Sequence, residues 1–313
     1  MEIGVVYPQI ELGGDPNAVR RIGKAVEDLG FDYLLAYDHV LGAVHDDRTP
    51  PLPGPYTERD PFHDPLVMFG YLAGITERIG LATGVLVLPQ RQTALVARQA
   101  ADVDLLSAGR LRLGVGVGWN HVEYEALGQD FRTRGAREEE QIGLLRRLFV
   151  EPVVDFGGRF DRVDRAALIP KPARAIPIWL GGSGEKAFDR AARLADGFIF
   201  FGAGGIDGAV DSWMAMRERL ATLDRSVEHF GAEYVSLSQG AEKPCRRERS
   251  VAGCRRHPLL DLDHGLWPRV DRSSRRLHLL GREGLGLVVT SSIRGLATNL
   301  RRLASTSVSV ATR

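Results

Sequence analysis

Short apolar runs alternate with amphipathic stretches along the first 240 residues. The runs are rich in aliphatic residues, as is typical of buried strands, and the stretches between them carry apolar residues at helical spacing. The predicted strands are residues 3–7, 33–36, 80–88, 111–117, 177–180, 197–201 and 233–237. The predicted helices are residues 16–29, 65–75, 93–106, 137–149, 186–195 and 210–223, the second with Asp64 as N-cap and Pro65 at its first position.

This order predicts an α/β fold in which helices cover both faces of a parallel sheet. Seven repeats without a nucleotide-binding fingerprint after the first strand favour a closed (β/α)8 TIM barrel, with an open doubly wound sheet as the alternative. Two insertions interrupt the alternation. Residues 45–63 are rich in Pro and Asp and predict a loop over the barrel mouth, and residues 153–174 predict a hairpin.

Composition points to an ordinary globular protein, with 44% hydrophobic and 26% charged residues. The formal net charge of +1 gives no reason to expect nucleic acid or an anionic membrane as partner. The two cysteines, Cys245 and Cys254, do not suggest a disulfide framework. We expect no signal peptide, because the first residues have neither a basic stretch nor an apolar one, and there is no run of 18 apolar residues. We therefore expect a cytoplasmic protein that acts on a small molecule.

The charge is distributed unevenly along the chain. From residue 244 onward there are 14 Arg, no Lys, 5 acidic residues, no Phe and no Tyr. We therefore divide the chain into a barrel of residues 1–243 and an atypical, Arg-rich segment of residues 244–313, which we expect to be disordered. Its bias resembles GC-rich DNA translated out of frame, so we hypothesise a frameshift near residues 240–245. A basic tail that binds an acidic partner is the alternative.

The eighth strand of the barrel is hard to find in this segment. Residues 285–290 are apolar enough, but they lie far from the seventh strand. Without an eighth strand the first and seventh strands would have unpaired edges, so we expect a weakened barrel.

Candidate chemistry follows the strands, because barrel active sites lie at the carboxyl ends of strands. Residues 116–120 and 181–184 are glycine-rich loops after successive strands. Glycine allows close backbone approach, and a following helix offers unpaired N–H groups, which together suit a phosphate. A tight turn alone would explain either loop, but two in succession favour a phosphorylated cofactor.

Asp38 and His39 follow the second strand. Histidine suits proton transfer, and Asp38 could orient it, although adjacent strand residues point to opposite faces. A capping Asp and a hydrogen-bonded His are the structural alternative. Trp119 would either stack on a flavin ring or belong to the core.

Other polar residues in the predicted loops do not indicate a binding site. His45, Asp46, Asp47 and His63 indicate a solvated loop rather than a metal site, since their spacing does not suit a metal. Arg91 could reach a phosphate, but we expect it to lie at the surface.

Four motifs, taken in order, indicate a known family. They are Tyr37-Asp38-His39, then Leu-Ala-Thr-Gly-Val at 81–85, Gly-Arg-Leu-Arg-Leu-Gly-Val-Gly-Val-Gly-Trp at 109–119, and Pro-Ile-Trp-Leu-Gly-Gly at 177–182. Over about residues 1–240 the chain resembles the luciferase-like monooxygenase superfamily, and most closely the branch that uses the deazaflavin coenzyme F420. FMN-dependent members share the barrel and much of this pattern.

The resemblance implies an oxidoreductase that transfers a hydride between coenzyme F420 and a small organic substrate, and often a homodimer. A phosphosugar is disfavoured, because the loop 202–205 has no Lys or Arg. The alternatives are an FMN-dependent monooxygenase and a non-catalytic barrel remnant.

The resemblance also implies roles for the matching residues. Asp38 and His39 would lie beside the redox ring, with His39 as proton donor or acceptor. A bulge with a non-proline cis peptide would lie behind the ring. The implied cofactor-binding residues are Thr83, Gly84 and Val85 at this bulge, and Gly118, Trp119, Asn120, Gly181, Gly182 and Ser183 along the phosphate and ribityl chain.

Overall fold

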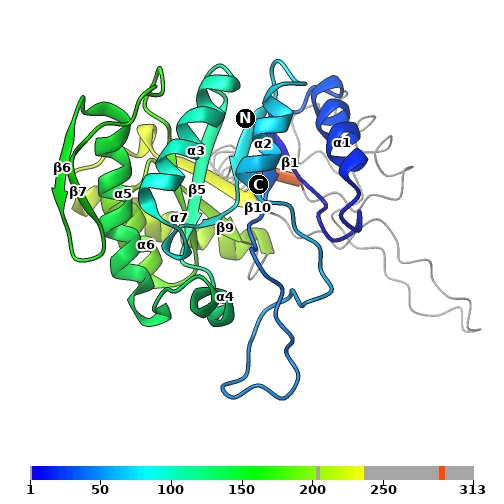
Figure 1. Ribbon diagram of the computed structural model, residues 1–313, viewed down its shortest axis with the longest axis horizontal. Helices are drawn as coiled ribbons and strands as arrows, with labels where there is room; N and C mark the ends of the chain where they lie inside the picture. Colours follow the sequence, from blue (N-terminus) through cyan, green and yellow to red (C-terminus); the bar gives the residue numbers. More distant parts are fainter. Residues whose placement is uncertain (1, 202–204, 236–288, 293–313) are drawn as a thin grey trace, which may run out of the picture.

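The computed structural model describes residues 2–201, 205–235 and 289–292, with the backbone alone for 205–207 and 289–292. The described strands pair in the ring order β3-β2-β1-β11-β10-β9-β8-β5, which a pairing of β3 with β5 closes (Figure 1). The ring strands are β1 (Ile3–Val6), β2 (Tyr33–Ala36), β3 (Gly80–Thr83), β5 (Leu111–Gly116), β8 (Ile178–Gly182), β9 (Gly197–Phe201), β10 (Gly231–Val235) and β11 (Val289–Ser292). The predicted closed barrel is confirmed.

The predicted strand 80–88 is wrong in its extent. It is divided into β3 and the two-residue β4 (Leu86–Val87), which pairs with β5, and a short 3-10 turn η1 (Leu88–Gln90) follows. The peptide bond between Gly84 and Val85, in the gap between the two strands, is cis. Continuous apolar character therefore conceals a bulge in the backbone.

The expectation of unpaired edges in the first and seventh strands is also wrong. β11 lies between β1 and β10 and pairs antiparallel with both, with Gly4 opposite Thr290 and Tyr234 opposite Ser291. The eighth strand thus overlaps the candidate 285–290, despite its distance from β10. Loop closure costs grow only with the logarithm of loop length, so a distant segment can still close the ring. The rest of the Arg-rich segment 244–313 lies outside the described residues.

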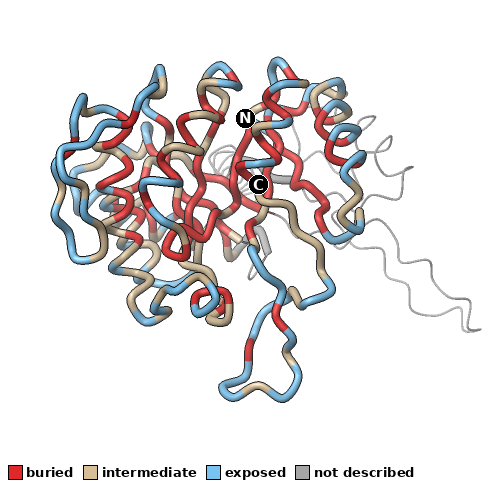
Figure 2. The backbone as a smooth tube through the Cα atoms, viewed as in Figure 1, coloured by how far each residue is buried: buried red, intermediate tan, exposed pale blue. Residues whose placement is uncertain are grey.

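Helices surround the ring and expose their outer faces, whereas the strands are buried (Figure 2). Asp64 caps α2 (Pro65–Ala73) ahead of Pro65, as predicted, and Asp15 likewise caps α1 (Pro16–Asp28). The predicted hairpin is also present as β6 (Val154–Gly157) and β7 (Arg162–Ala166). The helices are α1 (Pro16–Asp28), α2 (Pro65–Ala73), α3 (Thr93–Leu106), α4 (His121–Ala126), α5 (Arg134–Val150), α6 (Glu185–Leu194) and α7 (Gly205–Thr222), with short turns η2 (Phe131–Thr133) and η3 (Val227–His229).

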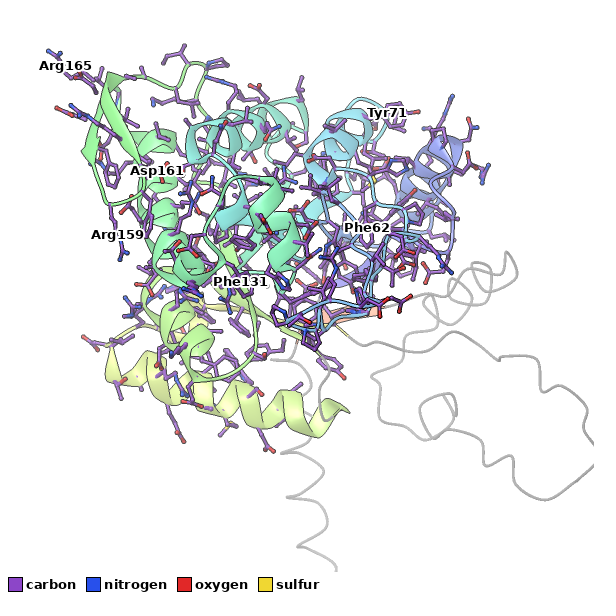
Figure 3. All side chains as sticks on the ribbon, turned by 60° about the horizontal axis from the view of Figure 1, so that its bottom comes forward. Phe62, Tyr71, Phe131, Arg159, Asp161 and Arg165 are labelled. Carbon is purple, nitrogen blue, oxygen red and sulfur yellow. The ribbon has the colours of Figure 1, made fainter. Side chains whose placement is uncertain are left out.

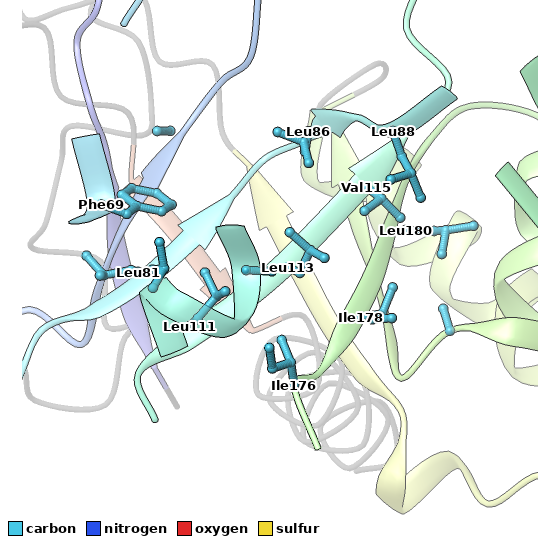
Figure 4. Packing of buried hydrophobic residues seen from close by; sticks show 14 of the residues in the cluster. Phe69, Leu81, Leu86, Leu88, Leu111, Leu113, Val115, Ile176, Ile178 and Leu180 are labelled. Atoms are coloured by element: carbon cyan, nitrogen blue, oxygen red, sulfur yellow. The ribbon is translucent and has the colours of Figure 1, made fainter. Parts of the chain in front are cut away.

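Alternate residues of each strand divide between the helix layer and the barrel interior. On β5, Leu111, Leu113 and Val115 face the helices, together with Ile178 and Leu180 of β8 (Figure 4). They belong to one large buried cluster with residues of α2, α3 and α5. The intervening residues point into the barrel.

The amino end of the barrel interior is filled by large side chains opposite glycines. A methyl group on Gly4 would lie 2.1 Å from the Tyr33 ring, and one on Gly231 would lie 2.0 Å from the Trp179 ring. The Arg112 guanidinium lies 4.4 Å and 4.2 Å from the centres of these two rings. Arg112 also forms an ion pair with buried Glu233, which accepts a 2.9 Å hydrogen bond from Tyr33.

A cavity of about 580 Å³ lies at this same amino end, with Arg112, Trp179 and Glu233 in its lining. It opens on the face opposite to the carboxyl ends of the strands. In barrels of this type that face contributes stability rather than catalysis.

The close fit between Trp179 and Gly231 predicts that Gly231→Ala lowers the free energy of unfolding by about 1–3 kcal/mol, because the added methyl overpacks the interior. Gly143→Ala on α5 is the matched control, since its added methyl has no neighbour within 4 Å. It should raise stability by about 0.5–1 kcal/mol. Chemical denaturation of both variants measures the difference, and equal midpoints would contradict this packing.

Candidate active site

Asp38 and His39 leave the carboxyl end of β2 toward different partners, as the alternation of side chains along an extended chain requires. Asp38 faces the segment that follows the bulge, and His39 faces α4. The two residues therefore do not act on one another directly. Asp38 connects the end of β2 to Val87 and Arg91, and His39 connects it to α4.

Asp38 is only 3% exposed. Its carboxylate accepts hydrogen bonds from Arg91 Nη2 at 2.6 Å and from the Val87 N–H at 2.9 Å. Arg91 also forms a 3.0 Å ion pair with Asp64, the N-cap of α2. Burial raises the pKa of the Asp38 carboxyl, and the Arg91 guanidinium opposes this rise. Arg91 thus occupies a half-buried position, and the expectation that it lies at the surface is wrong.

His39 pairs with Glu123, a residue of α4 that the sequence motifs did not single out. His39 Nδ1 lies 3.2 Å and 3.3 Å from the two carboxylate oxygens of Glu123. Glu123 is fully buried, and burial acts to raise its pKa. The hydrogen bonds from His39 and from the Leu41 N–H outweigh this effect, so the pKa lies below its ordinary value. Among the described residues, His39 Nε2 has no hydrogen-bond partner.

Aromatic rings surround the His39 imidazole, whose side chain is 10% exposed. Ring centres of Phe62, Tyr56 and Trp119 lie 4.9, 5.2 and 5.4 Å from it. Tyr56 and Phe62 belong to the loop between β2 and α2, which extends below the barrel in Figure 1. Figure 3 shows Phe62 and Phe131 on this end of the molecule. The predicted mouth loop therefore supplies part of the site.

The same loop covers Trp119. A methyl group on Gly54 would lie 2.5 Å from the Trp119 ring, so the loop backbone rests against the indole. His45 Nε2 donates a 2.9 Å hydrogen bond to the Tyr56 carbonyl, and the His45 ring lies 6.2 Å from Trp119. Trp119 is thus part of the site wall and not of the barrel core.

The bulge brings three strand ends together. Val85 projects between β5 and β8, because methyl groups on Gly116 and Gly181 would lie 2.5 Å and 2.6 Å from its side chain. Val87 faces Gly118, whose φ of +63° favours glycine. Thr83 is buried and donates a 2.6 Å hydrogen bond to the Gly114 carbonyl.

The loop after β8 leads directly into α6. Gly182 and Gly184 have φ angles of +151° and +82°, Ser183 is exposed, and a methyl group on Gly184 would meet nothing within 4 Å. The first N–H groups of a helix have no acceptor within it, and α6 has no side-chain cap. This end of the helix is open to an anionic group.

Asn120 has structural contacts instead. It is 2% exposed, accepts a 3.1 Å hydrogen bond from the Val122 N–H as the N-cap of α4, and donates to the Leu41 carbonyl at 3.4 Å. Gly118, Trp119 and Asn120 therefore make three different contacts, and only Trp119 borders His39.

Comparison with known proteins shows which family shares this sequence. Residues 1–240 match the family model described as luciferase-like monooxygenase. The chain belongs to this family.

Its relatives include named F420-dependent enzymes. The chain is 31% identical over 220 residues to an uncharacterized protein of Mycobacterium tuberculosis, covering 69% of this chain and 75% of the relative. It is 31% identical over 187 residues to the F420-dependent glucose-6-phosphate dehydrogenase of Nakamurella multipartita, covering 59% of this chain and 52% of that enzyme.

Solved structures share the fold. An F420-dependent secondary alcohol dehydrogenase in complex with an F420–acetone adduct superposes with a TM-score of 0.60 at 19% identity, covering 74% of this chain and 68% of that one. The monooxygenase RslO1 of Streptomyces bottropensis gives a TM-score of 0.62 at 20% identity, covering 74% and 70%. Members of this luciferase-like fold thus serve both deazaflavin and oxygenase chemistry.

The residues of this luciferase-like protein fit a phosphorylated flavin or deazaflavin. The open start of α6 suits the phosphate, and the apolar Val85 side chain, which projects at the bulge between Gly116 and Gly181, suits the ring. No cluster of three His, Cys, Asp or Glu side chains that could hold a metal occurs in the part of the chain that the structure describes. Nor does any helix found there have the length and apolar character needed to cross a membrane.

The structure adds four residues that the sequence analysis did not assign to the site: Glu123, Tyr56, Phe62 and Arg91. Only Glu123 carried a usable signal, since an acidic residue in the first turn after a glycine-rich loop suggests a helix start facing the barrel mouth. The partners of the other three lie on separate elements and cannot be read from spacing.

Arg91→Met should lower the free energy of unfolding by about 3–5 kcal/mol, because it leaves the Asp38 carboxylate buried without its cation. Arg21→Met removes the exposed Asp15–Arg21 pair, with 40% and 65% exposed side chains, and should cost less than about 1 kcal/mol. Denaturant titration compares the two. A similar small loss in both variants would show that the Asp38 ion pair does not stabilise the mouth.

Proposed function

We propose that this protein is an oxidoreductase that transfers a hydride between coenzyme F420 and a small organic substrate. The observation that carries the proposal is the His39 imidazole at the barrel mouth, held by Glu123 on one nitrogen and without a partner on the other among the described residues. The F420-dependent enzymes among its relatives support the choice of cofactor.

Chain contacts suggest how the cofactor would be held. Gly181, Gly182, Ser183 and the first N–H groups of α6 would bind the phosphate. Thr83, Gly84 and Val85 would support the ring from behind, and Gly118 and Trp119 would border it. Bound F420 would supply a two-electron hydride donor or acceptor at ring carbon five.

Asp38 and Asn120 would not contact the cofactor directly. Asp38 would orient the segment after the bulge through Val87 and Arg91. Asn120 would hold the start of α4 and the Leu41 carbonyl. Both would act by positioning their neighbours.

His39 would manage the proton that accompanies hydride transfer. Oxidation of an alcohol releases a proton from the hydroxyl, and reduction of a carbonyl takes one up at the oxygen. An imidazole with one free nitrogen can do either near neutral pH. The surrounding rings exclude water, which strengthens the interactions of His39 with a substrate oxygen.

The walls of the site suggest an uncharged substrate. Tyr56, Phe62 and Trp119 face His39, and these side chains offer apolar surface rather than cationic groups. A small alcohol, a carbonyl compound or an activated double bond fits these walls better than a phosphosugar. The loop 202–204, on which the sequence argument against a phosphosugar rested, lies outside the described residues.

The proposed function also carries an expected cellular location and an expected partner. Cys245 and Cys254 provide no disulfide framework, so we place the reaction in a reducing cytoplasm. A second copy of the chain, in a homodimer, is the macromolecular partner that we infer from the family resemblance.

Titration of the whole protein with F420 and, in parallel, FMN tests the cofactor. We expect micromolar binding of F420, followed by its fluorescence, and weaker binding of FMN. Preference for FMN together with oxygen consumption would instead assign an FMN-dependent monooxygenase.

Binding of neither cofactor would favour a non-catalytic barrel remnant. Sequencing of the gene around residues 240–245 then tests the frameshift hypothesis. A family-like strand and helix encoded in another frame would support it.

His39→Gln should reduce turnover by roughly 10²–10⁴-fold, as removal of a general acid–base does, with less than about threefold change in F420 affinity. A panel of small alcohols, ketones and enones, read by F420 absorbance, identifies the substrate and measures the loss. His229→Gln, on the exposed turn η3, is the control and should retain activity. Full activity of His39→Gln would remove His39 from the mechanism.

A further inference from the structure

We propose that Glu123 is a positioning residue that fixes the tautomer of His39, so that Nε2 is the atom that exchanges the proton with the substrate. This inference rests on the role of His39 in the proposed function. It adds a residue outside the motifs by which the chain resembles its family. Its central prediction concerns the protein without any cofactor.

Local structure holds Glu123 rigidly. α4 spans only His121–Ala126, but two hydrogen bonds fasten it. Asn120 caps its start, and the neighbouring Tyr124 hydroxyl donates a 2.6 Å hydrogen bond back to the Val117 carbonyl at the end of β5. The Glu123 side chain therefore projects from a fixed backbone toward the end of β2.

Four donors converge on the Glu123 carboxylate. The N–H groups of Val40 and Leu41 donate to Oε1 at 2.7 Å and 3.0 Å. Gln90 Nε2 donates to Oε2 at 3.3 Å, and His39 Nδ1 lies within reach of both oxygens. A buried carboxylate with this many donors is stabilised in its ionised form.

The charge on Glu123 decides where the hydrogen of His39 lies. An ionised carboxylate only accepts hydrogen bonds, so Nδ1 of His39 must carry a hydrogen. In the neutral imidazole, Nε2 then holds the lone pair and can take the proton that a substrate hydroxyl releases. In the protonated imidazole, the Nε2–H can return that proton to a carbonyl oxygen, while Glu123 balances the positive charge.

A purely structural role is the competing explanation, because Glu123 also fastens the start of the mouth loop through Val40 and Leu41. The two roles differ in what Glu123→Gln does. A glutamine can still accept from both backbone N–H groups through its oxygen. Its amide nitrogen would donate toward His39 Nδ1, which reverses the tautomer without removing the fastening.

The test is nitrogen-15 NMR of the whole protein with labelled histidine and without cofactor, at a pH at which the His39 imidazole is neutral. The variant His39→Gln assigns the signal. We expect the wild-type protein to carry hydrogen on Nδ1 and Glu123→Gln to carry it on Nε2. Glu125→Gln, on the exposed face of the same helix, should leave the tautomer unchanged. A wild-type Nε2–H tautomer overturns the proposal even if Glu123→Gln fails to fold.

Kinetics give a second readout. Glu123→Gln should lower kcat roughly 10- to 100-fold with little change in KM, and should move the pH profile of kcat, whereas Glu125→Gln should change neither. An unchanged pH profile in a folded Glu123→Gln variant overturns the proposal. If the tautomers are as expected but F420 does not bind the wild type, the proposed function fails while the placement of the His39 hydrogen stands.

Discussion

The geometry of the barrel mouth depends on the buried Asp38 carboxylate, on the Arg91 guanidinium that balances its charge, and on the Val87 N–H that donates a hydrogen bond to it. A buried carboxylate is tolerated only when such partners surround it. Arg91 and the Val87 N–H meet that need, and Arg91 extends the link to Asp64 at the start of α2. Because Asp38 is held on one side of the chain, His39 is directed to the other, toward Glu123.

A complementary distribution of large and small residues gives the barrel a filled end and an open end. At the amino end, Tyr33 and Trp179 occupy the space that glycines on neighbouring strands leave. At the carboxyl end, Gly116 and Gly181 leave only Val85 between β5 and β8. The close packing at one end holds the strands in register. At the other end Val85 covers both glycines, and the first N–H groups of the nearby helix α6 have no side-chain cap.

Chemistry and enclosure come from different parts of this luciferase-like chain. The strand ends and α4 place the charged groups, and the loop between β2 and α2 adds Tyr56 and Phe62 around His39. Loops vary more readily than strands because few core contacts constrain them. The lining around His39 can therefore change through this loop, while the pairing of His39 with Glu123 stays fixed to the barrel.

Hydrophobic periodicity by itself determined the α/β order of strands and helices and the placement of glycine loops and His39 at strand ends, because burial imposes a regular spacing on sequence. It favoured a closed barrel but left an open sheet as the alternative. Only the tertiary structure revealed that Glu123 contacts His39 across 84 positions, that Arg91 is half-buried against Asp38, and that β11 closes the ring. Such contacts join separate elements, and no local spacing encodes which side chains meet there. The family resemblance predicted the cis peptide at the Gly84–Val85 bulge, and the structure confirms it. Periodicity alone missed the bulge, since an apolar run has the same pattern whether its backbone is extended or turned.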